Sequence, residues 1–193
     1  MSVGRDTVTA VILTGGRSTR MGRDKASLVP DAADGRSLAR IVRDALAPVA
    51  AHALLAGPPV DDLPGVPAVG DRNPGRGPLG AITGALSRVP SHHLAVVAAC
   101  DMPSITPALV AHLLDRAAGD SRLLCVLCST DSGLEPLLSV WRPAAAPLLE
   151  PGTAALRDAI AALPHAVVEP DEWRQHDPAG ASFANWNTPA DLP

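Results

Sequence analysis

The chain has 193 residues, of which 47% are apolar, and a formal net charge of −4. This length favours a single domain that buries roughly 70% of the surface of the unfolded chain, and we expect that domain to span residues 1–193. The negative charge argues against general nucleic-acid binding. The polar start and the short apolar runs favour a cytoplasmic protein with no signal peptide and no membrane span.

Strands and helices are predicted to alternate along the sequence. The apolar run 8–13 indicates a buried strand, and Ser37 is a suitable cap for a helix whose apolar residues continue at helical spacing to Val49. Further strands are predicted at 50–56, 66–69, 93–99, 122–128, 135–141 and 165–169. Further helices are predicted at 78–86, from Thr106-Pro107 to Ala117, at 143–149 and at 153–162. The alternation predicts an α/β fold with a Rossmann-like, doubly wound and mostly parallel sheet.

A glycine-rich, cationic loop follows the first strand: Leu13-Thr14-Gly15-Gly16-Arg17-Ser18-Thr19-Arg20-Met21-Gly22-Arg23-Asp24-Lys25. Lys25 is the only lysine among 16 Lys and Arg residues, which suggests a task that needs a compact ammonium on a flexible stem. Open α/β sheets bind ligands outside the carboxyl ends of their strands, so the backbone N–H groups and the cations of this loop can hold an anion. The loop lacks the spacing of a Walker A motif. A solvated basic loop is the alternative interpretation.

Two aspartates follow other predicted strands. Asp101 comes directly after the 93–99 strand, at the sheet edge that also carries the glycine loop, where a carboxylate beside phosphates suits Mg²⁺. An Asx turn before a helix is the alternative. Asp71 lies in the Pro- and Gly-rich connection 57–78 and could meet a base or ribose, or only shape a turn. A connection of this length in a compact domain favours a functional role.

The last third of the chain gives weaker signals. Asn185 and Asn187 alternate, so on a strand they would present paired amides to one side, although Thr188-Pro189 also fits a helix start. Cys125 and Cys128 match the C-x-x-C spacing but fall in a predicted strand, where residues three apart face opposite sides. Buried core thiols are therefore favoured over a metal or redox site.

The segment from Leu13 to Lys25 resembles the signature of the molybdenum cofactor guanylyltransferase family, L-x-G-G-x-S-x-R-M-G-x-D-K. The resemblance extends in family order over almost the whole chain, at Asp71 with Gly77-Pro78-Leu79-Gly80, at Cys100-Asp101-Met102-Pro103, at Glu135 to Trp141, and at Asn185 to Pro189. It implies a fold of the nucleotide-diphospho-sugar transferase type. It also implies Mg²⁺-dependent transfer of GMP from GTP to the terminal phosphate of molybdopterin, with release of pyrophosphate. Molybdoenzymes or their chaperones would be candidate protein partners.

The family's functional positions carry over residue by residue. The nucleotide would contact Leu13, Thr14, Gly15, Gly16, Lys25, Asp71 and Asp101. Arg20, Lys25 and Asp101 would be the catalytic residues, with Mg²⁺ on Asp101, and Asn185 and Asn187 would lie on the acceptor side. The chain departs from the family at Thr14, where alanine is common, and at 53–57, which lacks an asparagine that some members use for the nucleotide.

Two alternatives remain open at this stage. One is a related nucleotidyltransferase with another nucleotide or acceptor, such as a cytidylyltransferase or an enzyme that acts on a sugar or alcohol phosphate. The form Leu13-x-Gly15-Gly16 resembles the guanine-using members more than the cytidine-using ones. The other alternative is a non-catalytic nucleotide-binding accessory protein, against which the joint presence of Lys25 and Asp101 argues.

Overall fold

The computed structural model describes residues 3–15, 25–30, 34–70, 77–149 and 155–186. Its strands form one sheet in the order β3-β2-β1-β4-β6-β5-β7. All neighbouring strands are parallel except β6, which is antiparallel to β4 and β5. The strands are β1 (Val8–Leu13), β2 (His52–Ala56), β3 (Ala68–Val69), β4 (Leu94–Ala99), β5 (Cys125–Thr130), β6 (Gly133–Trp141) and β7 (His165–Val168). The predicted α/β fold with a mostly parallel sheet is confirmed.

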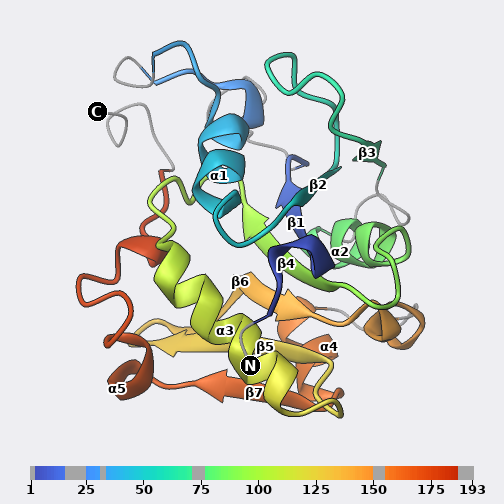
Figure 1. The fold of residues 1–193 in the computed structure, drawn as a ribbon, viewed down its shortest axis with the longest axis vertical. Helices are drawn as coiled ribbons and strands as arrows, with labels where there is room; N and C mark the ends of the chain where they lie inside the picture. Colours follow the sequence, from blue (N-terminus) through green and yellow to red (C-terminus); the bar gives the residue numbers. More distant parts are fainter. Residues whose placement is uncertain (1–2, 16–24, 31–33, 71–76, 150–154, 187–193) are drawn as a thin grey trace.

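Helices cover both faces of this sheet. The α-helices are α1 (Leu38–Leu46), α2 (Pro78–Leu86), α3 (Pro107–Gly119), α4 (Leu156–Ala161) and α5 (Pro170–Trp173), and the 3₁₀ helices are η1 (Arg5–Thr7), η2 (Lys25–Ser27), η4 (Pro143–Leu148) and η5 (Ala181–Phe183). Residues of α1, α3 and α5 share one core with the sheet, and residues of α2, η4 and α4 share the other. Figure 1 shows α1 and α3 in front of the strands. In the described ranges, no helix has the length and apolar character that crossing a membrane requires.

The two cores follow from the alternation of side chains along each strand. In β1, Val8, Ala10 and Ile12 enter the core of α1 and α3, whereas Val11 and Leu13 enter the core of α2. All six residues of β1 and all six of β4 are buried, as expected for central strands of a doubly wound sheet. Because these two central strands are fully buried, binding chemistry is left mainly to the strand ends.

Cys125 and Cys128 obey the same alternation. Cys125 lies in the core of α2 and Cys128 in the core of α1 and α3, so the two thiols face opposite sides of the sheet and are both buried. Burial raises the pKa of the Cys125 thiol far above its usual range. The pKa of Cys128 is raised to about 12, mainly by burial and also by the nearby carboxylates of Glu135, Glu172 and Asp177. The interpretation as buried core thiols is confirmed.

Helix starts are set by local chemistry in one case and by a distant partner in another. The Ser37 hydroxyl accepts a hydrogen bond from the Arg40 N–H at 3.1 Å, which confirms the predicted cap of α1. That helix ends at Leu46 rather than Val49, because Pro48 has no N–H to continue the ladder. Helix α3 does begin at Pro107 with Thr106 at its N-cap position, but the Thr106 side chain makes no capping bond. Instead, the Thr106 N–H donates to the distant Ser182 Oγ at 2.8 Å.

Several other boundaries differ from the sequence-based prediction. Strand β5 continues to Thr130 and β6 already starts at Gly133, because Asp131-Ser132 alone forms the hairpin loop and Gly133 adopts a φ of +107°. The helical segment predicted at 143–149 is the 3₁₀ helix η4, in which Pro147 removes an N–H that an α-helix would use. The short helix α5 was not predicted from its four residues.

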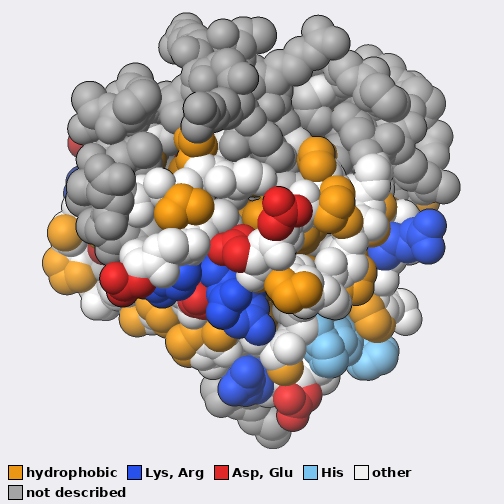
Figure 2. Space-filling model, turned by 90° about the horizontal axis from the view of Figure 1, so that it is seen from above, with side chains coloured by type: hydrophobic (Ala, Val, Ile, Leu, Met, Phe, Trp, Pro, Cys, Tyr) orange, Lys and Arg blue, Asp and Glu red, His pale blue; other side chains and the backbone are white. Residues whose placement is uncertain are grey.

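Charges of both signs are interspersed on the described surface. Arg40 and Arg43 both pair with Asp44, at 3.2 and 2.9 Å, on the outer face of α1. Figure 2 shows the same mixture, with basic and acidic side chains next to one another on the described part of the face seen from above.

Candidate active site

The strand order of the sheet reverses at β1. The chain moves from β1 to β2 on one side, and β4 then pairs with β1 on the other side. Such a switch point leaves a crevice at the carboxyl ends of the two strands, where open α/β sheets bind ligands. Leu13 and Ala99, the last residues of β1 and β4, are paired in register. The Cys100 N–H also donates to the Leu13 carbonyl at 3.3 Å, so the glycine loop and Asp101 leave the sheet side by side.

Lys25 and Asp101 meet above this switch point. Lys25 Nζ donates to Asp101 Oδ2 at 2.6 Å, and the two side chains are only 16% and 20% exposed. The residues lie 76 positions apart and come together because one is the first residue of η2 and the other follows β4. A partly buried, charge-assisted bond is stronger than a surface pair, so it fixes both groups at this edge. The structure thus joins the two residues that carried the sequence-based hypothesis.

The second oxygen of Asp101 has a different environment. Asp101 Oδ1 is buried and has no hydrogen-bond partner among the described residues. Buried polar atoms are nearly always partnered, so an unpartnered carboxylate oxygen at a strand end points to a ligand. The described residues contain no cluster of three or more His, Cys, Asp or Glu that could hold a metal ion. A lone carboxylate oxygen is consistent with Mg²⁺, which typically takes one or two protein carboxylates together with phosphate oxygens and water.

Thr14 ties the start of the glycine loop to the segment after β2. Its hydroxyl, on a side chain that is almost fully buried, donates to the Pro58 carbonyl at 2.8 Å. The N–H groups of Thr14 and Gly15 both donate to the Ala56 carbonyl, at 3.1 and 3.3 Å. The donors of Thr14 are therefore used within the protein. A nucleotide would have to approach Thr14 through its remaining atoms.

The close approach between these two segments depends on Gly57. This residue has a φ of +138°, and a Cβ built there would lie 2.4 Å from Gly15 N and 2.7 Å from Thr14 Oγ1. The Gly57 N–H donates to the Val69 carbonyl at 2.9 Å, which also connects the segment to β3. Sequence reasoning noticed that this segment lacks an amide but missed its role as a support for the loop.

The C-terminal segment reaches the same strand end. The Trp186 N–H donates to the Asp101 carbonyl at 2.8 Å, and the preceding residue, Asn185, is exposed. The predicted acceptor-side residue Asn185 therefore adjoins the residue that pairs with Asp101. Four other predicted site residues, Gly16, Arg20, Asp71 and Asn187, lie outside the described residues.

Comparison with known proteins identifies the family. The model of the "MobA-like NTP transferase domain" matches residues 10–172. A "probable molybdenum cofactor guanylyltransferase" of Chloroflexus aggregans is 34% identical over 191 residues, covering 96% of this chain and 91% of that protein. The chain belongs to the MobA-like NTP transferase family. It is therefore a nucleotidyltransferase.

Solved structures agree on the fold of this MobA-like transferase. Molybdopterin-guanine dinucleotide biosynthesis protein A of Archaeoglobus fulgidus superposes with a TM-score of 0.77 at 24% identity, covering 95% of this chain and 94% of that one. The Rv0371C protein of Mycobacterium tuberculosis, solved in complex with manganese, gives a TM-score of 0.56 at 16% identity, covering 86% of this chain and 89% of that one. The family match includes Lys25 and Asp101 and ends before the segment that contains Asn185.

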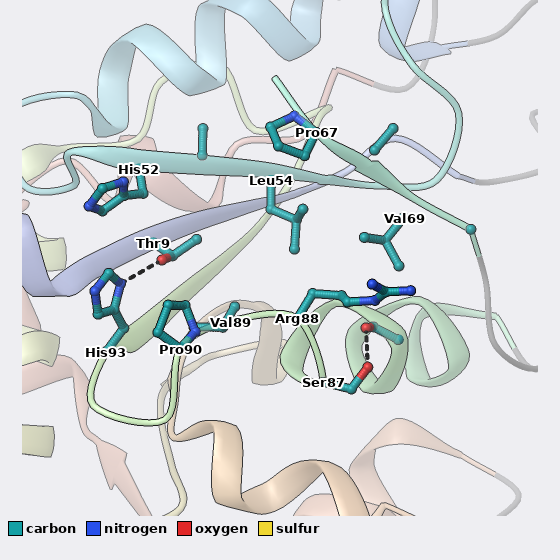
Figure 3. Close-up of a pocket in the computed structure, with 14 residues that line it drawn as sticks. Thr9, His52, Leu54, Pro67, Val69, Ser87, Arg88, Val89, Pro90 and His93 are labelled. Carbon is teal, nitrogen blue, oxygen red and sulfur yellow. Dashed lines mark hydrogen bonds between the residues drawn. The ribbon is translucent and has the colours of Figure 1, made fainter. Parts of the chain in front are cut away.

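A large cavity of the MobA-like transferase lies away from these residues. It measures about 1160 Å³ and lies between β2, β3 and the end of α2. Figure 3 shows His52, Thr9 and His93 at one end of this cavity and Arg88 and Val69 at the other. The Thr9 hydroxyl lies 3.0 Å from His93 Nδ1. None of the predicted site residues that the structure describes lines the cavity, so its size alone does not make it the active site.

Proposed function

We propose that this chain is a molybdenum cofactor guanylyltransferase that transfers GMP from GTP to the terminal phosphate of molybdopterin and releases pyrophosphate. The observation that carries the proposal is the Lys25–Asp101 pair at the β1–β4 switch point, where Asp101 Oδ1 has no hydrogen-bond partner in the described part of the chain. Membership of the MobA-like family and relatives named as guanylyltransferases support the choice of nucleotide and acceptor.

The reaction joins two phosphates without a protein nucleophile. An oxygen of the acceptor phosphate attacks the α-phosphorus of GTP, and the bond from that phosphorus to the oxygen bridging to the β-phosphate breaks. The acceptor is already an anion, so the protein has only to place the phosphates in line and to offset their charge. This explains how a site without a Ser-His pair could perform the transfer.

Lys25 and Asp101 have complementary tasks in this scheme. The Lys25 ammonium, held at the strand end by Asp101, would take up negative charge that develops on the transferring phosphate. Asp101 would hold a divalent cation, which we expect to be Mg²⁺, through its buried Oδ1. When bound, such an ion neutralises charge on phosphate oxygens. We expect Arg20 to offset negative charge on the same phosphate, and we expect the glycine loop and Asp71 to bind the nucleotide.

The test measures pyrophosphate release from GTP, CTP and UTP with molybdopterin as the acceptor. We expect release with GTP, and we expect Lys25→Ala to lower turnover by on the order of 10²-fold, as for other cations placed on transferring phosphoryl groups. Asp101→Asn should abolish the Mg²⁺ response. The exposed Asp115 on α3 provides the control Asp115→Asn, which should behave as wild type.

A cytidylyltransferase and an accessory protein would each give a distinct result in this assay. Release with CTP but not GTP would identify a cytidylyltransferase. Tight GTP binding without release from any nucleotide would identify an accessory protein. Near-normal turnover of Lys25→Ala would contradict the role of the ammonium.

A further inference from the structure

A buried carboxylate organises the segment that leads to Asn185. Asp177 is 2% exposed, and its two oxygens accept the N–H groups of Ala181 and Ser182, at 3.1 and 2.8 Å. The salt bridges of the described residues do not include it. Burying a carboxylate is costly unless it is hydrogen-bonded, and these two hydrogen bonds offset that cost. They also hold the backbone of η5 in place.

Ser182 connects η5 to the loop after β4. Its side chain is fully buried, and its Oγ accepts the Thr106 N–H at 2.8 Å. Four residues later, the Trp186 N–H donates to the Asp101 carbonyl at 2.8 Å. Two hydrogen bonds thus attach the segment 177–186 to the loop 101–106, one at each end of that loop. Figure 1 shows the orange-red segment beside the start of α3.

Aromatic packing supports this segment from the other side. The rings of Trp173 and Phe183 meet edge to face, with centroids 4.9 Å apart. Gly180 has a φ of +64°, and a Cβ there would lie 3.4 Å from the Trp173 ring. Trp173 Nε1 in turn donates to the Ser129 carbonyl of β5 at 2.8 Å. The segment is therefore attached to the sheet as well as to the loop that carries Asp101.

We infer that Asp177 and Ser182 are positioning residues that hold the acceptor-side segment and the loop of Asp101 in one fixed arrangement. The inference rests on the proposed function, which places Asn185 at the acceptor and Asp101 at the nucleotide phosphates. Neither Asp177 nor Ser182 touches the substrates in this scheme. Their loss should misplace the acceptor relative to the α-phosphate and leave nucleotide binding intact.

Ser182→Ala removes the acceptor of the Thr106 N–H, and Ser139→Ala is its matched control. Ser139 is also fully buried, and its Oγ accepts the Trp141 Nε1–H at 2.7 Å, within β6. Both variants should lower the melting temperature, since each leaves one donor without its partner. Ser139→Ala should lower it at least as much, because the Ser139 hydroxyl also donates to the Pro136 carbonyl at 2.8 Å. We expect only Ser182→Ala to raise the KM for molybdopterin, by about tenfold, while the Kd for GTP stays unchanged.

Asp177→Asn is the second variant, because its amide can accept only one of the two N–H groups, and it should raise the same KM. In the wild-type protein, the amide hydrogens of Thr106 and Trp186 should exchange slowly, and both should exchange faster in Ser182→Ala. An unchanged KM for molybdopterin in both variants, an equal loss of GTP affinity, or fast exchange of these amides in the wild type would overturn the inference. Absence of pyrophosphate release by the wild type would instead overturn the proposed function.

Discussion

The substitution Gly57→Ala tests the close approach between the glycine loop and the segment after β2. The new Cβ would lie 2.4 Å from Gly15 N, 2.7 Å from Thr14 Oγ1 and 2.9 Å from Gly15 Cα, so backbone would have to move. The φ of +138° adds strain of about 1–3 kcal/mol. Overpacking adds about 1–3 kcal/mol more.

The middle of this range is a loss of about 4 kcal/mol, which for a chain of this size lowers the melting temperature by about 12 °C. Alanine substitutions at two other glycines separate the backbone strain from the overpacking. Gly65 has a φ of +82° and open space around its Cβ position, so Gly65→Ala should cost only the backbone strain, about 1–2 kcal/mol. Gly119, at the end of α3, has open space and no positive φ, and Gly119→Ala should leave the melting temperature unchanged or raise it slightly.

The assay is thermal unfolding followed by circular dichroism for all three variants, together with GTP titration by calorimetry. Gly57→Ala should melt lowest and should also bind GTP more weakly, because the displaced Gly15 backbone belongs to the loop that we propose binds the nucleotide. If Gly57→Ala melts together with Gly65→Ala, the close approach contributes nothing and the reasoning is wrong. If it melts lower but binds GTP as the wild type does, the support of the nucleotide loop is refuted.

Three further predictions concern other parts of the molecule. Thr14→Val deprives the Pro58 carbonyl of its donor and should cost about 1 kcal/mol, or about 3 °C in melting temperature, whereas Thr14→Ser should melt as wild type; equal stability of Val and Ser would contradict this. The pKa of His93 is lowered by burial and by the neighbouring histidines, so below about pH 6.5 the unfolded chain binds a proton that folded His93 does not bind. The free energy of unfolding measured in urea should therefore decrease as the pH is lowered below about 6.5, and the His93 contribution should be fully present above that pH. A profile that stays equally steep in His93→Gln would exclude His93 as its source. Cys125 and Cys128 should resist iodoacetamide in the folded protein and react after unfolding in urea, and rapid labelling of the native chain would show that the cores open readily.

The sequence was sufficient wherever local pattern decides the structure. The apolar runs of β1 and β4 predicted central strands, and the Ser37 cap predicted the start of α1. The joint location of Lys25 and Asp101 was also predictable, because both follow strands whose carboxyl ends share one edge.

Local sequence pattern could not predict contacts between residues that are far apart in the sequence. Thr106 matches a capping residue by type, yet its N–H is used by Ser182, 76 positions away, and no periodicity encodes that bond. The function of Gly57 likewise depends on how near Gly15 lies in space. The antiparallel direction of β6 could be anticipated from its tight hairpin with β5, but its place beside β4 depends on tertiary packing.

That place of β6 has a consequence for the order in which the molecule is assembled. The pairing of β4 with β6 joins a sheet half made by residues 8–99 to a half made by residues 125–168. The first half contains the strands that bring Lys25 and Asp101 together, and it leaves the ribosome first. The Asp101 carbonyl acquires its Trp186 partner only after the second half has docked, since that partner follows the strands of the second half in the chain. Nascent chains that end after α3 should therefore bring Lys25 and Asp101 together before Trp186 is present to bind the Asp101 carbonyl.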